Sequence, residues 1–283
     1  MIYWQNESVA LFRSFLYMTV SAVIQTEDLV VVVDPTWLLH EVEEIRNHTD
    51  KILNGRPLYL LFTHSDYDHI LGYKAFPGAS VIASEAFQTK REQEKQAIVE
   101  QIKAFDDDYY IVRDYGIEYP EVDVLAKTDG DTYTVGGTRF VFYQAPGHND
   151  DGMFIVIEPL GLLIAGDYFS DVEFPFIYYS SEQYEQSLLK LDGIIARHSL
   201  QMLIPGHGEF TRETAEMKRR QLESLRYIHE MRKYLAVGDQ KRVDELISDC
   251  RFPRNQRKFH RNNQLLMEKE LQTHSDIGAS EIE

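Results

Sequence analysis

Four side chains that can bind a metal occur within seven residues, in the stretch THSDYDH at positions 63–69. The stretch directly follows the apolar run PLYLLF, which predicts a buried strand. Burying a charge is costly unless the charge is paired or coordinates a metal. These histidines and aspartates must therefore be solvated, paired or bound to metal. The chain has a single cysteine, Cys250, so a metal site has to be built from histidine and carboxylate.

Three further histidine or aspartate residues follow predicted strands. His148 comes after YQAPG, Asp167 ends LLIAGD, and His207 lies in LIPGHG. In layered α/β proteins, functional sites are built on the loops that leave the strand ends. Each motif alone is typical of a polar turn, but four such loops in one chain favour a shared metal site.

The ordered motifs THSDYDH, APGH, AGD and PGHG resemble those of the metallo-β-lactamase superfamily of metal-dependent hydrolases. The resemblance covers most of residues 1–210 and includes VVDP, DHILG and the predicted hairpin DGDTYTVGG. It implies a four-layered α/β fold, the αββα sandwich, and two divalent metal ions, with zinc as the first expectation. The ligands that it implies are His64, Asp66 and His148 for one ion, Asp68, His69 and His207 for the other, and Asp167 as a bridge.

Such a pair of ions supports hydrolysis. Two divalent ions about 3.5–4 Å apart can share a water, lower its pKa and polarise an electrophile. The ions also take up the oxyanion charge that develops when hydroxide attacks. We therefore expect a hydrolase that uses a metal-bridging hydroxide, with Asp68 and Tyr168 as candidate catalytic residues. The sequence has no GxSxG motif that would suggest a serine nucleophile.

Asp66 departs from the superfamily pattern, which usually has a histidine at that position. Asp66, Asp68 and Asp167 bring three negative charges, and a hydroxide brings a fourth. These charges cancel those of two divalent cations, so the metal core is neutral. A neutral core should acidify its bound water less than the positively charged core that a histidine at position 66 would give. Carboxylate is also a harder ligand than imidazole, so manganese or iron competes better with zinc. Another interpretation places Asp66 outside the ligand set, which leaves the protein with a single metal.

A rival function comes from the flavodiiron branch of the superfamily, which carries an acidic residue at this position and binds two irons for redox work. Those proteins append a flavodoxin-like domain, whereas only 76 residues follow His207 here. That length is short of a domain of about 100–150 residues. We therefore rank a hydrolase above a non-haem di-iron redox protein.

The elements that must position these residues alternate between strands and helices, which indicates a layered α/β fold. Apolar runs predict strands, and apolar residues at helical spacing predict amphipathic helices. The predicted elements are strands at 28–37, 58–62, 80–84 and 202–208, hairpins at 129–146 and 152–167, and helical segments at 38–53, at 85–112 and from Ser180 onward.

Two parts of the chain are distinguished by pattern. Residues 1–210 carry the strands and the motifs and form the predicted metal-binding domain. Residues 211–283 are helical in pattern and are predicted to form an extension that packs on this domain. The apolar stripe in LRYIHEMRKYL (225–235) favours packing or contact in a homodimer.

Charge and composition exclude other classes of function. The net charge of −17 repels phosphates and argues against nucleic acid as a partner. No apolar run approaches the roughly 20 residues that a membrane span needs. The N-terminus has no basic start or continuous apolar stretch, so no signal peptide is expected. We therefore expect a cytoplasmic protein that acts on a small molecule.

The segment that follows Asp167, YFSDVEFPFIYYSSEQY, is rich in aromatic residues and suits either the lining of a substrate pocket or packing on the sheet. Tyr168 is the best candidate for a substrate contact because it directly follows Asp167. In the glyoxalase II branch, basic residues of the C-terminal helices hold an anionic thioester. Arg254, Arg257 and Lys258 are candidates for that part, although a packing role of this region is preferred. A small ester, thioester or lactone is the expected substrate.

Overall fold

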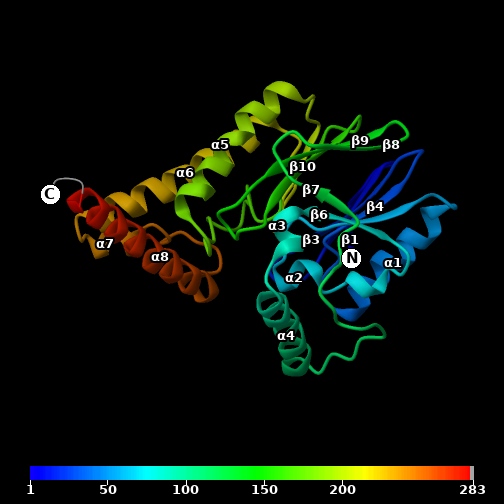
Figure 1. The fold of residues 1–283 in the computed structure, drawn as a ribbon, viewed down its shortest axis with the longest axis horizontal. Coiled ribbons are helices and arrows are strands. Elements are labelled where there is room, and N and C mark those ends of the chain that lie inside the picture. Colours follow the sequence, from blue (N-terminus) through cyan, green and yellow to red (C-terminus); the bar gives the residue numbers. More distant parts are fainter. Residues whose placement is uncertain (281–283) are drawn as a thin grey trace.

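Two β-sheets lie face to face at the centre of the molecule, and helices cover the outer face of each sheet (Figure 1). The computed structural model describes the backbone of residues 1–280 and the side chains of residues 1–273. The α/β class and the αββα sandwich that the sequence predicts are confirmed. Helices follow the sandwich at the C-terminal end of the chain.

The first sheet has seven strands in chain order, antiparallel from β1 to β4 and parallel from β4 to β7. Its first three strands come from the N-terminal residues, where the sequence shows only a weak alternation of apolar and polar residues. The strands are β1 (Ile2–Gln5), β2 (Val9–Arg13), β3 (Val20–Gln25), β4 (Val30–Val33), β5 (Leu58–Leu61), β6 (Ser80–Ser84) and β7 (Val124–Ala126).

The second sheet has five strands in the order β12-β11-β10-β9-β8. Both predicted hairpins are confirmed, since β8 pairs with β9 and β10 pairs with β11 in antiparallel register. The last pair, β11 and β12, is parallel. The strands are β8 (Thr132–Val135), β9 (Thr138–Gln144), β10 (Met153–Glu158), β11 (Leu162–Ile164) and β12 (Met202–Ile204).

The central strands are buried on both faces because their successive side chains enter different cores. In β10, Ile155 packs between the two sheets, whereas Val156 packs beneath the helices of the second sheet. In β4, Val31 likewise lies between the sheets and Val32 lies beneath the helices of the first sheet. A strand covered on both faces needs apolar residues at every position. This explains the runs VVVV and MFIVI.

The helices on the first sheet come from the first half of the chain. The segment 85–112, predicted as helical, is broken at Lys90 and ends at Asp108. Lys90 has an extended backbone, and its ammonium group lies 3.3 Å from a carboxylate oxygen of Asp151. A tertiary ion pair thus accompanies the break in a sequence of good helix formers. The helices are α1 (Leu39–Leu53), α2 (Tyr67–Ile70), a 3₁₀ turn η1 (Tyr73–Ala75), α3 (Glu85–Thr89) and α4 (Glu92–Asp108).

The remaining helices pack on the second sheet and on one another. Ser180 caps α5, because its hydroxyl oxygen accepts a hydrogen bond from the backbone N–H of Gln183. The predicted stripe in 225–235 enters the core through Ile228 and Met231. Helix α8 begins near the centre of the molecule and runs outward (Figure 1). The helices are α5 (Ser181–Arg197), α6 (Thr214–Ala236), α7 (Gln240–Glu245) and α8 (Pro253–Ser280).

Two further predictions concern the end of the C-terminal extension and the absence of membrane spans. The predicted extension runs to residue 283, and its last three residues lie outside the described part of the chain. Across residues 1–280, no helix combines the length and the apolar character required of a membrane span.

Candidate metal centre

The seven predicted metal-binding residues lie together at one end of the strands. His64 follows β5, His148 follows β9, Asp167 follows β11 and His207 follows β12. Within each of two groups, one potential ligand atom per residue lies within 4.8 Å of the others. The groups are His64, His148 and Asp167, and Asp68, His69 and His207.

Asp167 lies between the two groups. Its Oδ1 atom is 3.2 Å from His69 Nε2, in the second group. Its Oδ2 atom is 3.3 Å from His148 Nε2, in the first group, and 3.4 Å from His207 Nε2, in the second. A carboxylate in this position can bind a metal ion on each side.

Asp66 lies at the edge of the first group. Its Oδ2 atom is 3.0 Å from His148 Nε2 and 3.7 Å from His64 Nε2. Its Oδ1 atom accepts a hydrogen bond from Asn149 Nδ2. Burial alone would raise the pKa of Asp66, but the hydrogen bond and the charge of His148 outweigh burial and hold this pKa below its usual range. Asp66 is therefore a carboxylate at ligand distance from the first group.

Each of the four imidazole rings is oriented by a hydrogen bond on its Nδ1 atom. Thr63 Oγ1 donates its own proton to Asp34 and is therefore free to accept from His64. With Nδ1 as the donor, every Nε2 atom that carries no proton presents a lone pair to the centre, as a metal ligand must. The four contacts are His64 Nδ1 to Thr63 Oγ1 (2.9 Å), His69 Nδ1 to Asp34 Oδ2 (3.0 Å), His148 Nδ1 to Phe176 O (2.7 Å) and His207 Nδ1 to Tyr17 O (2.9 Å).

Asp34, at the end of β4, is a functional residue that the sequence reasoning missed. It accepts hydrogen bonds from the backbone N–H of Thr63 (2.9 Å), from Thr63 Oγ1 (2.6 Å) and from His69 Nδ1. It therefore orients His69 directly and His64 through Thr63. Its φ of 43° lies in the left-handed region, which aspartate tolerates better than most residues. The signal in the sequence was the motif VVDP, which ends a strand next to the strand that leads to His64.

The donor atoms fit bound metal ions. His64 Nε2, His69 Nε2 and Asp167 Oδ1 are buried and have no hydrogen-bond partner. Although His69 Nε2 and Asp167 Oδ1 lie close together, both are acceptors in this arrangement. Buried polar atoms rarely stay unpaired, and a divalent cation would satisfy all three. Gly206 leaves the necessary space, since a Cβ atom there would lie 2.4 Å from Asp167 Oδ1.

The electrostatics of the cluster also favour positive charge at its centre. Burial lowers the pKa of His148, yet Asp167 and Asp66 raise it to about 9. Burial likewise lowers the pKa of His207, yet Glu173 and Asp167 raise it to about 10. The carboxylates thus attract a cation, either protons or metal, to the point where the Nε2 atoms meet.

A cavity of about 450 Å³ opens over the ligands. Apart from Lys258, the lining residues that the sequence did not point to come from the loop before β3, the loop before α1, α4 and one face of α8. Tyr17, Trp37, Tyr67, Phe176, Tyr178 and Phe259 make its walls aromatic. Its other lining residues are Asp66, Asp68, Gln101, His148, Asp167, Glu173, His207, Asn255, Lys258 and Asn262.

The structure places Tyr168 away from this cavity, which disagrees with the predicted substrate contact. Its ring is buried and stacks on Tyr184 at 4.2 Å between ring centroids. Its hydroxyl lies 3.0 Å from the carbonyl oxygens of Ala145 and Pro146 and accepts from the N–H of His148. The aromatic ring of Tyr168 therefore packs inside the protein, and its hydroxyl group stabilises the loop that carries His148.

The three basic residues predicted near the site are separated by the periodicity of α8. Lys258 lines the cavity. Arg254 and Arg257 are exposed on other faces of the helix and are not among the described residues that line the cavity. This helix both packs on the core and lines the cavity, because Met267 enters the core while Phe259 stacks on Phe176 at 4.0 Å between ring centroids.

The comparisons with known proteins agree with the fold. The model of the metallo-β-lactamase superfamily matches residues 15–208, well over half of the chain. The chain therefore belongs to the metallo-β-lactamase superfamily, whose members are generally metal-dependent hydrolases. No curated protein sequence matches the chain.

Solved structures show the same fold at low sequence identity. A metallo-β-lactamase family protein from Thermus thermophilus is 19% identical, with 95% of each chain covered and a TM-score of 0.67. The sec-alkylsulfatase Pisa1 from Pseudomonas sp. is 12% identical with a TM-score of 0.69; the match covers 95% of this chain and 50% of that one. ETHE1 from Myxococcus xanthus is 18% identical with a TM-score of 0.53, and the match covers 77% of this chain and 84% of that one.

Proposed function

We propose that the protein is a binuclear metal-dependent hydrolase, with zinc as the native metal, that cleaves a small anionic ester, thioester or lactone in the cytoplasm. The observation that carries this proposal is the convergence of two ligand groups on Asp167, with every imidazole oriented through Nδ1. His64, Asp66 and His148 would hold one ion, Asp68, His69 and His207 the other, and Asp167 both.

When bound, two such ions lower the pKa of a shared water and polarise the bond to be cleaved. Asp68 belongs to the second group and also lines the cavity, so the carboxylate oxygen that does not bind metal is available to accept a proton from the attacking water. Thr63, Asp34 and the carbonyl oxygens of Phe176 and Tyr17 keep the imidazoles in one tautomer. The aromatic walls exclude water around the substrate, which strengthens electrostatic contacts in the cavity.

The part of the cavity wall that α8 forms supports an anionic substrate. Lys258 is the one lysine or arginine among the lining residues that the structure describes, in a protein of net charge −17. It has no ion pair with any described side chain. A carboxylate or phosphate on the substrate would pair with it. The cavity volume suits a small molecule.

A di-iron redox protein is the second candidate, and Asp66 is the observation that favours it. The Asp66 carboxylate lies 3.0 Å from His148 Nε2, so the first group has the oxygen ligand that harder metals prefer. The metal itself decides between the two functions.

The first experiment is elemental analysis of protein purified without chelator, followed by assays with thioesters, esters and lactones. We expect about two zinc ions per chain, together with hydrolysis that a chelator abolishes and zinc restores. The variant Asp167→Asn should lose both metal and activity. Asp129→Asn is the matched control, since Asp129 accepts a backbone hydrogen bond from Gln144 and belongs to neither group of converging ligand atoms.

Other outcomes lead to definite conclusions. Two irons with a visible absorption band would favour the redox function. One metal per chain would show that Asp66 does not complete a site. A protein that neither contains metal nor takes it up on reconstitution would overturn the proposal.

A further inference from the structure

Glu173 lies on the segment that joins β11 to α5, six residues after the central metal ligand Asp167. Ser170 folds this segment into a turn, since its Oγ atom accepts from the N–H groups of Val172 (3.1 Å) and Glu173 (3.2 Å). The same hydroxyl donates to the carbonyl oxygen of His207 (2.9 Å). The backbone of Glu173 is thereby tied to the loop that carries a metal ligand.

Two buried amides of α8 fix the segment on either side of Glu173. Gln256 Nε2 donates to the carbonyl oxygen of Val172 at 2.6 Å. Asn263 Nδ2 donates to the carbonyl oxygen of Pro175 at 2.6 Å, and Asn263 Oδ1 accepts from the N–H of Ile177. With both neighbouring stretches held, the position of Glu173 is set by the fold rather than by a free loop.

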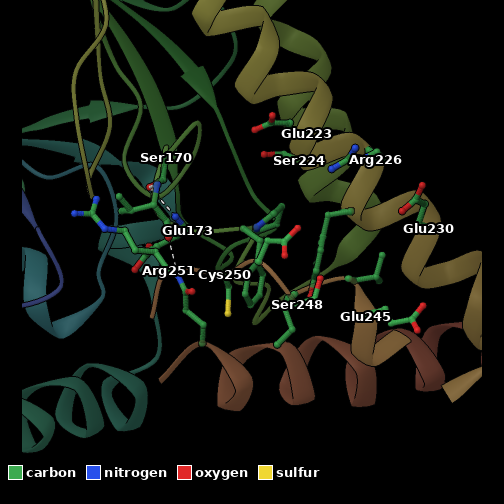
Figure 2. A pocket seen from close by; sticks show the side chains of 18 of the residues that line it. Ser170, Glu173, Glu223, Ser224, Arg226, Glu230, Glu245, Ser248, Cys250 and Arg251 are labelled. Atoms are coloured by element: carbon green, nitrogen blue, oxygen red, sulfur yellow. Dashed lines mark hydrogen bonds between the residues drawn. The ribbon is translucent and has the colours of Figure 1, made fainter. Parts of the chain in front are cut away.

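The Glu173 side chain lies on the wall between two cavities. One is the metal-site cavity, and the other is a cavity of about 690 Å³ bounded by α6 and α7. Figure 2 shows Glu173 beside Ser170 on the wall of this second cavity, across from Glu223, Ser224 and Arg226 of α6. The charged groups that act most strongly on its carboxyl are His207, Asp167 and Asp68, which places the carboxyl next to the metal centre.

The carboxylate of Glu173 is left without a partner. No hydrogen bond or ion pair to it is found among the side chains of residues 1–273, and it belongs to neither group of converging metal-binding atoms. Burial raises its pKa to about 7. A half-buried carboxylate that no described residue satisfies is costly, and such a group beside a substrate cavity is available to a ligand.

We propose that Glu173 is a specificity-determining residue that accepts a hydrogen bond from a hydroxyl or ammonium group on the acyl part of the substrate. This inference rests on the proposed hydrolase function. The carbonyl to be cleaved must lie at the metal ligands, and the Glu173 carboxyl lies beside those ligands. The donor group is therefore close to that carbonyl. Lys258, on α8, would pair with an anion on the leaving group.

Three thioesters of 3-mercaptopropionate test the proposal, because they differ only in the acyl group: 2-hydroxypropanoyl, 2-aminopropanoyl and propanoyl. For the zinc-loaded wild type, we expect kcat/KM to be about tenfold higher for an acyl group with a donor than for propanoyl. In Glu173→Ala this preference should fall to near one. Glu173→Gln, which keeps an acceptor oxygen without the charge, should retain more preference for hydroxyl than for ammonium.

Glu230→Ala is the matched control, since Glu230 lines the second cavity but is not among the described residues that line the metal-site cavity. An equal preference in wild type and Glu173→Ala, or no preference in wild type, would overturn the inference. If no thioester is hydrolysed, the proposed function fails separately. Calorimetry with 2-hydroxypropanoate and propanoate then gives the readout: the inference requires tighter binding of the hydroxy acid by wild type and no difference in Glu173→Ala.

Discussion

The two walls of the metal-site cavity differ in how their polar groups are satisfied. On the metal wall, each imidazole donates its Nδ1 proton to a fixed acceptor, and only the atoms that face the centre remain unpaired. The facing wall is formed by the lining residues outside the proposed ligand set, and its two charged members, Glu173 and Lys258, have no ion pair with any side chain of residues 1–273. The first wall leaves unpaired the atoms that would bind the proposed metal ions, whereas the second leaves two charges that are available to the proposed substrate.

The two walls also come from different parts of the chain. The metal wall is built from strand-end loops within residues 15–208, the part that matches the superfamily. Much of the facing wall comes from α8 (Pro253–Ser280), beyond that part. We infer that the superfamily fold supplies the reaction and that the C-terminal helix supplies much of the specificity. Each of the following predictions tests one side of this comparison.

The largest effect is expected from Asp34→Asn on the metal wall. The amide cannot accept from His69 Nδ1, Thr63 N–H and Thr63 Oγ1 at once, so His69 and His64 lose their fixed orientation. We expect metal affinity to fall about 10–100-fold, measured by competition with a chromophoric chelator. Asn also tolerates the left-handed backbone at this position, so the fold should be kept.

Asp28→Asn is the control for that experiment. Asp28 lies at the opposite end of β4 and accepts from the backbone N–H of Gly137 (2.8 Å). Equal metal affinity in the two variants would show that the Nδ1 contacts do not matter for metal binding, and the contrast between the two walls would then lose its basis.

A smaller effect is expected on the facing wall, from Lys258→Met. Loss of the ammonium group should raise KM for an anionic substrate about three- to tenfold with little change in kcat, because an exposed charge contributes modestly to binding. An uncharged analogue should show no change. Arg257→Met is the control, since Arg257 is exposed on the same helix and is not among the described lining residues. The same rise in KM for both variants would mean that long-range charge, rather than Lys258, attracts the substrate.

The sequence predicted the metal wall well because its information is local. His64, His148, Asp167 and His207 each follow an apolar run that predicts a strand, and loops that leave strand ends are where sites are built in layered α/β proteins. Asp34 was missed because its partner, His69, is 35 residues away and nothing local marks the contact. Tyr168 was chosen for its proximity in sequence to Asp167, which does not fix the direction of a ring.

The facing wall could not be predicted for a related reason. Helical periodicity groups Asn255, Lys258 and Asn262 on one face, but it does not say what that face meets. The direction of α8 is set by the contacts of Gln256 with Val172 and of Asn263 with Pro175. These contacts join residues 84 and 88 positions apart. Such contacts depend on the finished tertiary structure, so the sequence predicts the helix and not its role.

The smallest effect concerns the joint that holds the facing wall in place. His260 of α8 is buried, and its Nδ1 atom lies 2.9 Å from the hydroxyl of Tyr227 on α6. Burial lowers the pKa of His260, while the carbonyl of Val243 and the charge of Asp244 oppose this effect. A histidine with a lowered pKa stabilises the fold fully above its unfolded pKa of about 6.5, and this stabilisation is lost as the pH falls through the folded pKa.

We therefore expect the melting temperature of the wild type to fall below about pH 6.5 by a few degrees more than that of His260→Gln, which has no titrating group at this position. Metal ligands titrate in both proteins, so the difference between the two curves isolates His260. Parallel curves of melting temperature against pH would show that protonation of His260 does not weaken the contact between α6 and α8. A steeper loss accompanied by a rise in KM at low pH, absent in His260→Gln, would show that the facing wall depends on this joint while the metal wall does not.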